Sequence, residues 1–248
     1  MNLLTTKAVK VTEKTIEVNK AIQSVTIRTE KTLEELVNEK INIEVQRSNG
    51  DNVPITHGNI PLKDYIVLGT MFDNAIGCDK LNQYAVKATI ALTEEDLASL
   101  HLHEKDLLKI SLTGLDATKT YVLDGNEAPS TTNDIFQYQR KSMNSEHEDM
   151  TFDVTGYDSV VITDKRSIEE INIRFDNGVM IKTTPSELRD LQESNDPIAQ
   201  VNLDGTVNAS FSSLIQVPLK GILSLNIRKK QGDIINLLMR HDVDITNL

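Results

Sequence analysis

One β-hairpin pattern occurs twice in this chain, separated by about half its length. The first copy spans residues 41–64 and the second spans residues 171–190. Each copy has an alternating apolar run, an Asn-Gly pair, a second short apolar run and a closing leucine, and the turn glycines Gly50 and Gly178 lie 128 residues apart. The first copy is longer by two residues in each arm. Because alternate side chains of a strand point to opposite faces, a difference of two residues in strand length leaves the same side chains facing the core.

This regularity indicates an internal duplication, and therefore two similar β units in one chain. The alternative is two unrelated hairpins, because Asn-Gly turns are common in β proteins. Asn49-Gly50 and Asn177-Gly178 each predict a two-residue turn with positive φ values.

The rest of the sequence is typical of a mainly β fold. Short strand-like runs recur between turn residues, at 21–29, 41–47, 65–71, 84–92, 107–112, 120–123, 150–154, 159–163, 171–175, 179–183, 199–203, 206–211, 214–217 and 222–228. So many short strands favour antiparallel sandwiches or barrels over a parallel α/β sheet. We therefore predict two tandem antiparallel β units.

Three segments carry the signals of a short helix. Thr93 precedes three acidic residues, as an N-cap does. Pro185 follows Thr184, at a position where its missing N–H costs nothing. Residues 233–240 contain four aliphatic side chains that would form one apolar face.

A connection between the two units is predicted near the middle of the chain. The sequence there is rich in turn residues and lacks apolar periodicity. A repeat displaced by half of a 248-residue chain also favours two domains of similar size. We place an N-terminal arm at residues 1–14, the first unit at 15–125, a linker at 126–149 and the second unit at 150–248.

Composition excludes several classes of protein. The 26 basic and 37 acidic residues give a formal net charge of −11, which disfavours direct binding to nucleic acid. Cys78 is the single cysteine, so an intramolecular disulfide framework is excluded and folding in a reducing cytoplasm is expected. The first residues lack the apolar core of a signal peptide, and no run is long enough to span a bilayer.

No residue pattern predicts catalysis, so we expect a protein that is not an enzyme and holds no cofactor. His101 and His103 would share one face of a strand, as in a metal-binding cupin, but the glutamate that a cupin needs beyond them is missing. Two exposed histidines in a loop are the other interpretation. Asp-rich turns such as Asp124-Gly125 and Asp204-Gly205 offer ligands for a structural Ca²⁺ between subunits, although ordinary turn chemistry also explains them.

Taken together, these features resemble the double jelly-roll major capsid proteins of tailless icosahedral viruses that enclose a membrane. The residues that carry the resemblance are 156–162, 168–178 and 188–191, with the matching hairpin at 41–64, in the order strand, hairpin and helix start. In size the chain is most similar to the corticovirus type or to small lipid-containing phages of aquatic bacteria. The resemblance implies a mainly β fold of two tandem antiparallel jelly rolls with a few short helices.

The resemblance also implies a structural function. The chain would form homotrimeric, pseudo-hexameric capsomers of an icosahedral shell around an internal membrane. Its partners would be further copies of itself, minor capsid and vertex proteins, and the internal lipid membrane. It would be located in the virion capsid after synthesis in the host cytoplasm. The alternatives are a minor capsid or vertex protein, and a tandem β sandwich that binds sugar or metal as lectins and cupins do.

The N-terminal arm is the candidate membrane contact. Leu3 and Leu4 are apolar, Lys7 and Lys10 are basic, and residues 1–14 carry three lysines against one glutamate, a net charge of +2. Each basic residue near an anionic lipid surface contributes about 1 kcal/mol to binding. We therefore expect this arm to face inward toward lipid, with a free arm or a clamp onto a neighbouring subunit as the alternatives.

Overall fold

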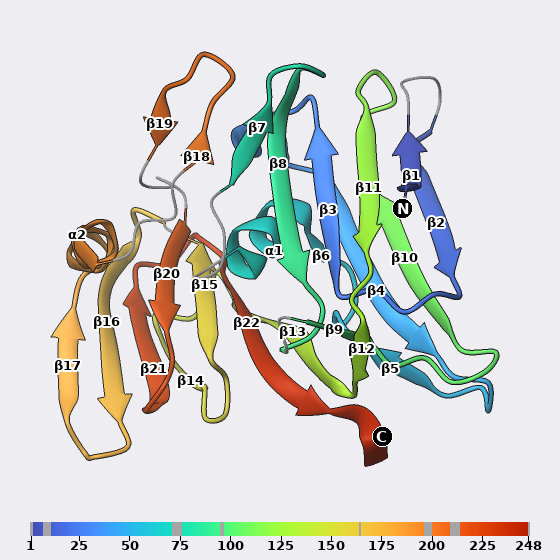
Figure 1. The fold of residues 1–248 in the computed structure, drawn as a ribbon. Helices are drawn as coiled ribbons and strands as arrows, with labels where there is room; N and C mark the ends of the chain where they lie inside the picture. The colour runs from blue at the N-terminus through green and yellow to red at the C-terminus, as the bar shows by residue number, and fades with distance from the viewer. Residues whose placement is uncertain are drawn as a thin grey trace.

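Almost all of the regular structure is β-strand (Figure 1). The computed structural model describes residues 2–6, 11–70, 76–94, 97–163, 165–195, 200–208 and 214–247. The strands of the first half are β1 (Asn2–Thr6), β2 (Glu13–Val18), β3 (Ser24–Thr29), β4 (Lys40–Gln46), β5 (Asn52–Pro54), β6 (Ile60–Pro61), β7 (Gly77–Asp79), β8 (Tyr84–Ala91), β9 (Ala98–Leu100), β10 (Leu107–Thr113), β11 (Tyr121–Asn126) and β12 (Ser130–Thr132).

The second half continues the same architecture. Its strands are β13 (Asp134–Met143), β14 (Asp149–Asp153), β15 (Ser159–Thr163), β16 (Ile168–Phe175), β17 (Met180–Thr183), β18 (Gln200–Val201), β19 (Val207–Asn208), β20 (Leu214–Pro218), β21 (Ile222–Lys229) and β22 (Ile235–Asp244). The helices are α1 (Leu62–Gly69) and α2 (Pro185–Asn195), with short 3₁₀ turns η1 (Leu33–Glu35) and η2 (Ile245–Asn247).

The two halves have the same strand order. Eight strands of each half form two antiparallel sheets, β1-β11-β3-β8 and β2-β10-β4-β5 in the first half, and β13-β22-β15-β20 and β14-β21-β16-β17 in the second. Counted along each half, one sheet runs first, eighth, third, sixth and the other runs second, seventh, fourth, fifth. This is the order of a jelly roll. The prediction of two tandem antiparallel jelly rolls is confirmed, and we call them the first roll and the second roll.

The repeated hairpins occupy the same place in both rolls. Each joins the fourth strand to the fifth, and a helix follows, α1 in the first roll and α2 in the second. In each turn the glycine N–H donates to the carbonyl oxygen three residues earlier, over 3.0 Å at Gly50 and 3.1 Å at Gly178. Both turns lie at the lower end of the molecule in Figure 1, so the two rolls stand in the same direction.

The turns are three-residue loops, and the prediction of two-residue turns was wrong. Only the glycine has positive φ, +94° at Gly50 and +83° at Gly178. The asparagine before it keeps an ordinary φ, because its side-chain oxygen accepts the N–H two residues further on, over 3.0 Å at both Asn49 and Asn177. The two hairpins therefore share their hydrogen bonds as well as their position.

The core arises from the alternation that the sequence displays. In β4, Ile41, Ile43 and Val45 are fully buried while the residues between them are less so. The neighbouring β10 buries Leu108 and Ile110 in the same way and pairs with β4 along its length. Alternate side chains of a strand face opposite sides, so this pattern forms one apolar layer between the two sheets.

One of the three predicted helices is confirmed. Pro185 is the first residue of α2. The Thr184 N–H donates to Glu187 Oε2 (2.7 Å), and the Glu187 N–H donates to Thr184 Oγ1 (3.3 Å), which is a capping box.

The other two predicted helices are wrong. Residues 233–240 enter β22, because β13 and β15 flank this segment and take its backbone hydrogen bonds. Thr93 forms a β-bridge with Ile135, and β9 follows it; residues 95–96 lie outside the described part of the chain.

The strand-like run at 65–71 is helical over its described residues. It belongs to α1, in which Tyr65, Ile66, Val67 and Leu68 are all fully buried. This run of successive apolar residues lacks the 3.6-residue period of an amphipathic helix, and this is why it resembles a strand in the sequence.

The predicted linker and arm both contain strands. Residues 134–143, inside the range 126–149, form β13, which pairs with all ten residues of β22. Residues 2–6, inside the range 1–14, form β1, which pairs with β11. Both strands are the first of their roll and lie at a sheet edge, where alternation of apolar residues is weak.

Strand β13 also joins the two rolls. Tyr138 exchanges two backbone hydrogen bonds, of 2.8 and 2.9 Å, with residues 55–57, and the Phe136 N–H donates one of 3.0 Å to the carbonyl oxygen of Leu92. We call this junction the seam, with β13 on one side and residues 55–57 and 92–94 on the other.

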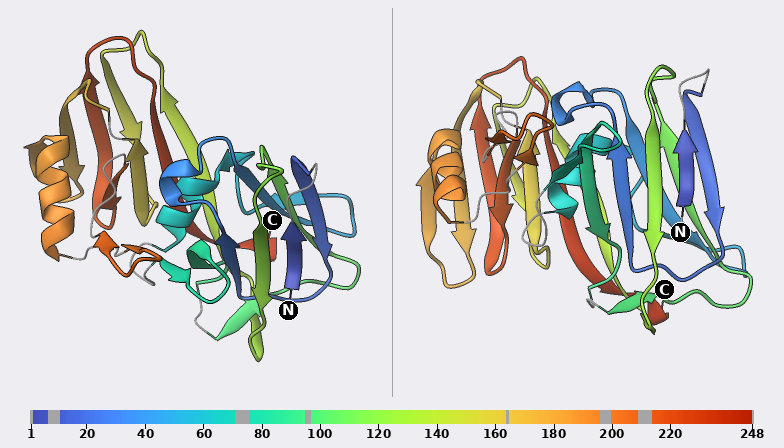
Figure 2. Two further views of the ribbon diagram at one scale, coloured as in Figure 1. Left: turned by 90° about the horizontal axis from the view of Figure 1, so that it is seen from above. Right: turned by 45° about the horizontal axis from the view of Figure 1, so that its top comes forward.

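Side chains of the two rolls also pack against each other at the seam. Tyr65 of α1 and Tyr138 of β13 are fully buried, and their ring centroids lie 4.8 Å apart in an edge-to-face arrangement. The apolar core of the first roll extends into the second and includes Ile135, Leu214 and Leu238. Figure 2 shows α1 between the two rolls. The rolls are therefore packed together rather than connected by a free linker.

We expect Tyr138→Ala to lower the free energy of unfolding by about 3 kcal/mol, as is typical of truncating a buried aromatic. Because β13 pairs with both rolls, urea denaturation followed by circular dichroism should give one transition at a lower midpoint. Leu81→Ala, at a side chain that is 90% exposed, should leave the midpoint unchanged. Separate transitions for the two rolls would contradict a shared seam.

Candidate assembly surfaces

The residues considered for metal binding or catalysis do not converge. His101 and His103 lie in the loop after β9, with ring centroids 4.7 Å apart, and His103 is exposed. Cys78 in β7 is half-buried, with its Sγ 3.4 Å from the carbonyl oxygen of Asn202. Within the described ranges, no group of three or more His, Cys, Asp or Glu side chains is placed to hold a metal ion. The loop interpretation of the two histidines is confirmed, with a strand rather than a helix before them.

The aspartates of the predicted calcium turns are engaged by other groups of the same chain. Asp204 Oδ1 accepts from the Thr206 hydroxyl (2.7 Å) and N–H (2.9 Å), and these hydrogen bonds hold the pKa of Asp204 below its usual value. Asp124 forms an ion pair with Arg28 of the neighbouring strand. A calcium ion between subunits stays a prediction, because a site of that kind needs ligands from a second copy.

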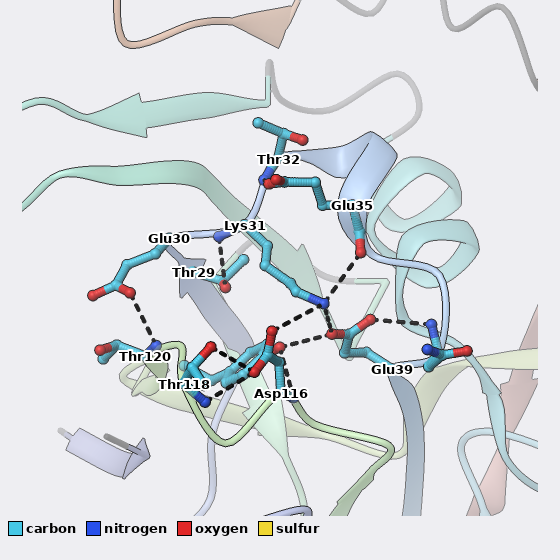
Figure 3. Close-up of polar contacts among 11 residues, drawn as sticks. Thr29, Glu30, Lys31, Thr32, Glu35, Glu39, Asp116, Thr118 and Thr120 are labelled. Atoms are coloured by element: carbon cyan, nitrogen blue, oxygen red, sulfur yellow. Dashed lines mark hydrogen bonds and ion pairs between the residues drawn. The ribbon is translucent and has the colours of Figure 1, made fainter. Parts of the chain in front are cut away.

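A buried charge network fixes the loops at the upper end of the first roll (Figure 3). Glu39 lies just before β4 and is buried, and its Oε1 accepts hydrogen bonds from Lys31 Nζ (2.5 Å) and Tyr121 Oη (2.7 Å). Lys31 Nζ also donates to the carbonyl oxygen of Glu35 (3.2 Å) and lies 3.9 Å from Asp116 Oδ2.

This network joins two loops that are distant in sequence. Lys31 and Glu39 belong to the segment between β3 and β4, and Asp116 belongs to the segment between β10 and β11. A buried carboxylate is costly unless it is paired and hydrogen-bonded, and Glu39 has both kinds of partner. Because the charged groups are engaged with one another, the network stabilises the shape of this end of the roll.

A lysine also fixes two loops of the second roll, between β13 and β14 and between β21 and β22. Lys229 is buried at the end of β21, and its Nζ donates to the carbonyl oxygens of Ser145 (3.1 Å) and Lys230 (3.3 Å). In each roll a lysine thus holds loops together, half-buried Lys31 in the first and buried Lys229 in the second, although the acceptors differ.

The second roll contributes an ion pair beside the seam. Arg240 of β22 is buried, and its Nε and one terminal nitrogen lie 2.8 and 2.7 Å from Asp158 Oδ2. The guanidinium carbon of Arg240 lies 4.3 Å from the centroid of the Phe136 ring of β13. These contacts orient β13 against the first roll.

Asp64 is a carboxyl group at the seam whose ionisation is shifted by burial. It lies in the first turn of α1, and burial raises its pKa from 3.8 to about 6, while the positive charges of Arg140 and Lys63 partly offset this effect. Arg140 belongs to β13, so the charge of Asp64 interacts with both rolls.

Exposed apolar side chains gather at one outer edge of the molecule. Val179, Met180 and Ile181, at and beside the start of β17, are 49%, 68% and 46% exposed, and Leu191 of α2 is 58% exposed. We call this the β17–α2 edge. At the opposite end of the row of strands lie β1 and β2, each the last strand of its sheet, which we call the β1–β2 edge (Figures 1 and 2).

Of the four residues predicted to face a membrane, two belong to the described part of the chain, and they lie at the β1–β2 edge. Leu3 and Leu4 belong to β1, and the backbone of Leu4 is in register with Leu123 of β11. Lys7 and Lys10 lie outside the described residues. Among the described residues, the helices are too short or too polar to cross a bilayer. Contact with lipid stays a prediction, and over residues 2–6 it would involve a strand rather than a free arm.

Sequence reasoning missed the residues that shape these surfaces. Glu39, Lys229 and Arg240 stand among exposed-looking polar residues, and no local pattern distinguishes a buried charge from a solvated one. The apolar run Val179-Met180-Ile181 was visible in the sequence as a strand signal. Three apolar residues in succession also indicate that both faces of an edge strand are apolar, and this signal could have marked the β17–α2 edge.

The fold matches solved structures of viral capsid proteins over the whole chain. The crystal structure of the STIV MCP is 9% identical, with 100% of this chain and 98% of that chain covered and a TM-score of 0.58. The major capsid protein P2 from bacteriophage PM2 is 10% identical, with coverage of 99% and 97% and a TM-score of 0.57. A chain in the atomic structure of Sulfolobus turreted icosahedral virus is 9% identical, with coverage of 99% and 90% and a TM-score of 0.60.

At these identities the likeness concerns the fold alone. It confirms the predicted resemblance to double jelly-roll major capsid proteins. No protein-family model matches the sequence, and no curated protein matches it.

We expect Glu39→Ala to lower the free energy of unfolding by about 3 kcal/mol, because the Lys31 ammonium and the Tyr121 hydroxyl lose their buried acceptor. Urea denaturation at neutral pH measures this loss. Glu34→Ala is the matched control, since Glu34 pairs with Lys63 over 2.9 Å but is 63% exposed, and it should change stability little. Equal effects of the two substitutions would show that the Glu39 network contributes no more than a surface ion pair.

We expect stability to rise on acidification through the pKa of Asp64. The folded protein holds this proton up to about pH 6 and the unfolded chain only up to about pH 3.8, so protonation favours the folded state between these values. Between pH 7 and pH 5 the wild type should gain about 1 kcal/mol more than Asp64→Asn, which cannot titrate. Thermal or urea unfolding at the two pH values gives the difference, and parallel pH profiles would contradict the assignment.

Proposed function

We propose that this chain is a structural subunit of an icosahedral viral capsid and has no catalytic activity. The observation that carries the proposal is the arrangement of two rolls with one strand order, standing in the same direction and joined by hydrogen bonds at the seam. A subunit of this shape presents two similar blocks side by side, which suits a flat tile. The major capsid proteins with the same fold support this function.

We further propose that three copies form a capsomer. Two rolls per chain give six similar blocks in a trimer, and six blocks around one axis form a pseudo-hexameric tile that packs without gaps. A contact between two different edges of the subunit is heterologous, and such contacts close into a ring when the rotation permits. The two unlike outer edges of the row fit this kind of contact.

In the proposed shell, the partners of the chain are other copies of itself, together with minor capsid and vertex proteins. The N-terminal residues Leu3, Leu4, Lys7 and Lys10 are proposed to face an internal membrane, since their apolar and basic character suits anionic headgroups. The location is the virion, after synthesis in the host cytoplasm.

Size-exclusion chromatography with light scattering, followed by negative-stain electron microscopy, tests the proposal. We expect the purified chain to form a trimer, and we expect particles with six-blocked projections. A chain that stays monomeric over the whole accessible concentration range would contradict a capsid tile. Copy number in purified virions separates a main tile from a minor or vertex protein.

A further inference from the structure

The turns of the two repeated hairpins have the same backbone hydrogen bonds, residue for residue. The N–H of Arg47 donates to the carbonyl oxygen of Asp51 (2.8 Å), and the N–H of Phe175 donates to that of Val179 (2.9 Å). The bonds of the glycine N–H and of the asparagine Oδ1 match as well, so position 51 corresponds to position 179. The two turns are therefore one backbone structure that carries different side chains.

Each turn contains the groups for a reaction between neighbouring residues. A backbone nitrogen that follows an asparagine can attack Cγ of the side-chain amide, and glycine hinders this attack least because it has no Cβ. Asn49-Gly50 and Asn177-Gly178 are exposed to water. Apart from the neighbours in the chain, no atom of the described residues lies within 4 Å of the position that a Cβ would take on either glycine. Both turns therefore have room for the ring that the attack forms.

The reaction needs no reagent besides water. The nitrogen of Gly178 would form a bond to Cγ of Asn177, and the bond from Cγ to Nδ2 would break. The amide group leaves as ammonia, which carries the proton lost by the glycine nitrogen, and the product is a cyclic imide. Water then adds to one of the two ring carbonyl carbons and opens the ring to aspartate or to isoaspartate, in which the backbone runs through the side-chain carbon.

One side chain distinguishes the two turns. In the first turn, Asn49 Oδ1 accepts the N–H of Asp51 (3.0 Å), and Asn49 Nδ2 donates to Oδ2 of Asp51 (2.7 Å). In the second turn, Asn177 Oδ1 accepts the N–H of Val179 (3.0 Å), and the valine side chain has no oxygen to offer to Nδ2. Residue 51 thus holds both ends of the asparagine amide, whereas residue 179 holds one end.

The additional hydrogen bond of the first turn opposes the reaction. A nucleophile reaches a carbonyl carbon from above the plane of the amide, so the side-chain amide must turn before the glycine nitrogen can attack. Turning the amide breaks the hydrogen bonds that Oδ1 and Nδ2 make in its plane. A hydrogen bond to a carboxylate is stronger than one between neutral groups, so the barrier is higher at Asn49 than at Asn177.

We propose that Asn177-Gly178 is a site of spontaneous deamidation, and that Asp51 protects the equivalent Asn49-Gly50 of the first roll. The reaction requires only the turn and water, so it proceeds whether or not the chain assembles.

Deamidation changes the turn of the second roll. Both products replace a neutral amide by a carboxylate next to Asp176. Isoaspartate also lengthens the backbone between residues 177 and 178, which displaces the Gly178 N–H from its acceptor, the carbonyl oxygen of Phe175. The fraction of altered turns therefore rises with the age of the protein.

Mass spectrometry of the full chain, incubated at neutral pH and digested at successive times, measures both sites in one sample. We expect the mass gain of an amide-to-acid conversion at Asn177, with isoaspartate detected by an isoaspartyl methyltransferase. The rate at Asn49 should be about fivefold lower, which is the effect of one hydrogen bond that must break. Asn82 is the control in the same digest, since it is exposed in a turn but is followed by Gln83.

Two reciprocal variants isolate the effect of the side chain. Asp51→Val gives the first turn the residue of the second, and Val179→Asp does the reverse, so each introduces a side chain that the equivalent turn already accommodates. Asp51→Val should raise the rate at Asn49 about fivefold, and Val179→Asp should lower the rate at Asn177 by about the same factor. Circular dichroism establishes that both variants are folded as the wild type is.

Three results would overturn the proposal. If Asn177 stays intact in the folded protein while it reacts in the urea-unfolded chain, the folded turn blocks the reaction. Equal rates at Asn49 and Asn177, unchanged by either substitution, would show that Asp51 gives no protection. A slower reaction of Asn49 in Asp51→Val would show that the carboxylate promotes the loss of ammonia instead of opposing it.

Discussion

The structure depends on one strand that satisfies hydrogen-bonding groups on both of its sides. β13 pairs along its whole length with β22 inside the second roll, and its other side bonds to residues 55–57 and 92–94 of the first roll. Burying an edge strand without such partners would leave backbone groups unpaired, at a cost comparable to a lost hydrogen bond for each. The shared strand therefore fixes the distance and direction between the two rolls.

The same topology is realised with different chemistry in the two rolls. Between the fifth and sixth strands, six of the eight residues of α1 are buried because the seam covers them, whereas α2 is mostly polar and presents Leu191 at 58% exposure. The duplication gives two rolls with the same strand order, and the position of each roll decides which residues lie at its edges. The inner edge is closed by proline and by β13, and the outer edge carries exposed apolar residues.

An ion pair in the first roll fixes the conformation of the loops at one end of the roll. Glu39 is buried beside the half-buried Lys31, and Tyr121 completes the hydrogen bonding of the carboxylate. Replacing such a pair by apolar residues is often neutral for stability, so its value lies in specifying how the loops meet. In the proposed shell, a defined loop end would give every copy of the subunit the same surface.

The sequence by itself determined the duplication, the mainly β architecture, the two Asn-Gly hairpins and the start of α2, because alternation, turn residues and caps are local signals. Only the tertiary structure decided that residues 235–240 are a strand, that 65–69 are a helix and that 134–143 belong to the second roll. In each of these segments the neighbouring elements determine the secondary structure or the roll to which the segment belongs. β22 is a strand because two strands flank it, and most of α1 is buried because it lies between the two rolls. The burial of Glu39 and the exposure of Met180 are likewise properties of position in the fold, which no spacing of residues along the chain encodes.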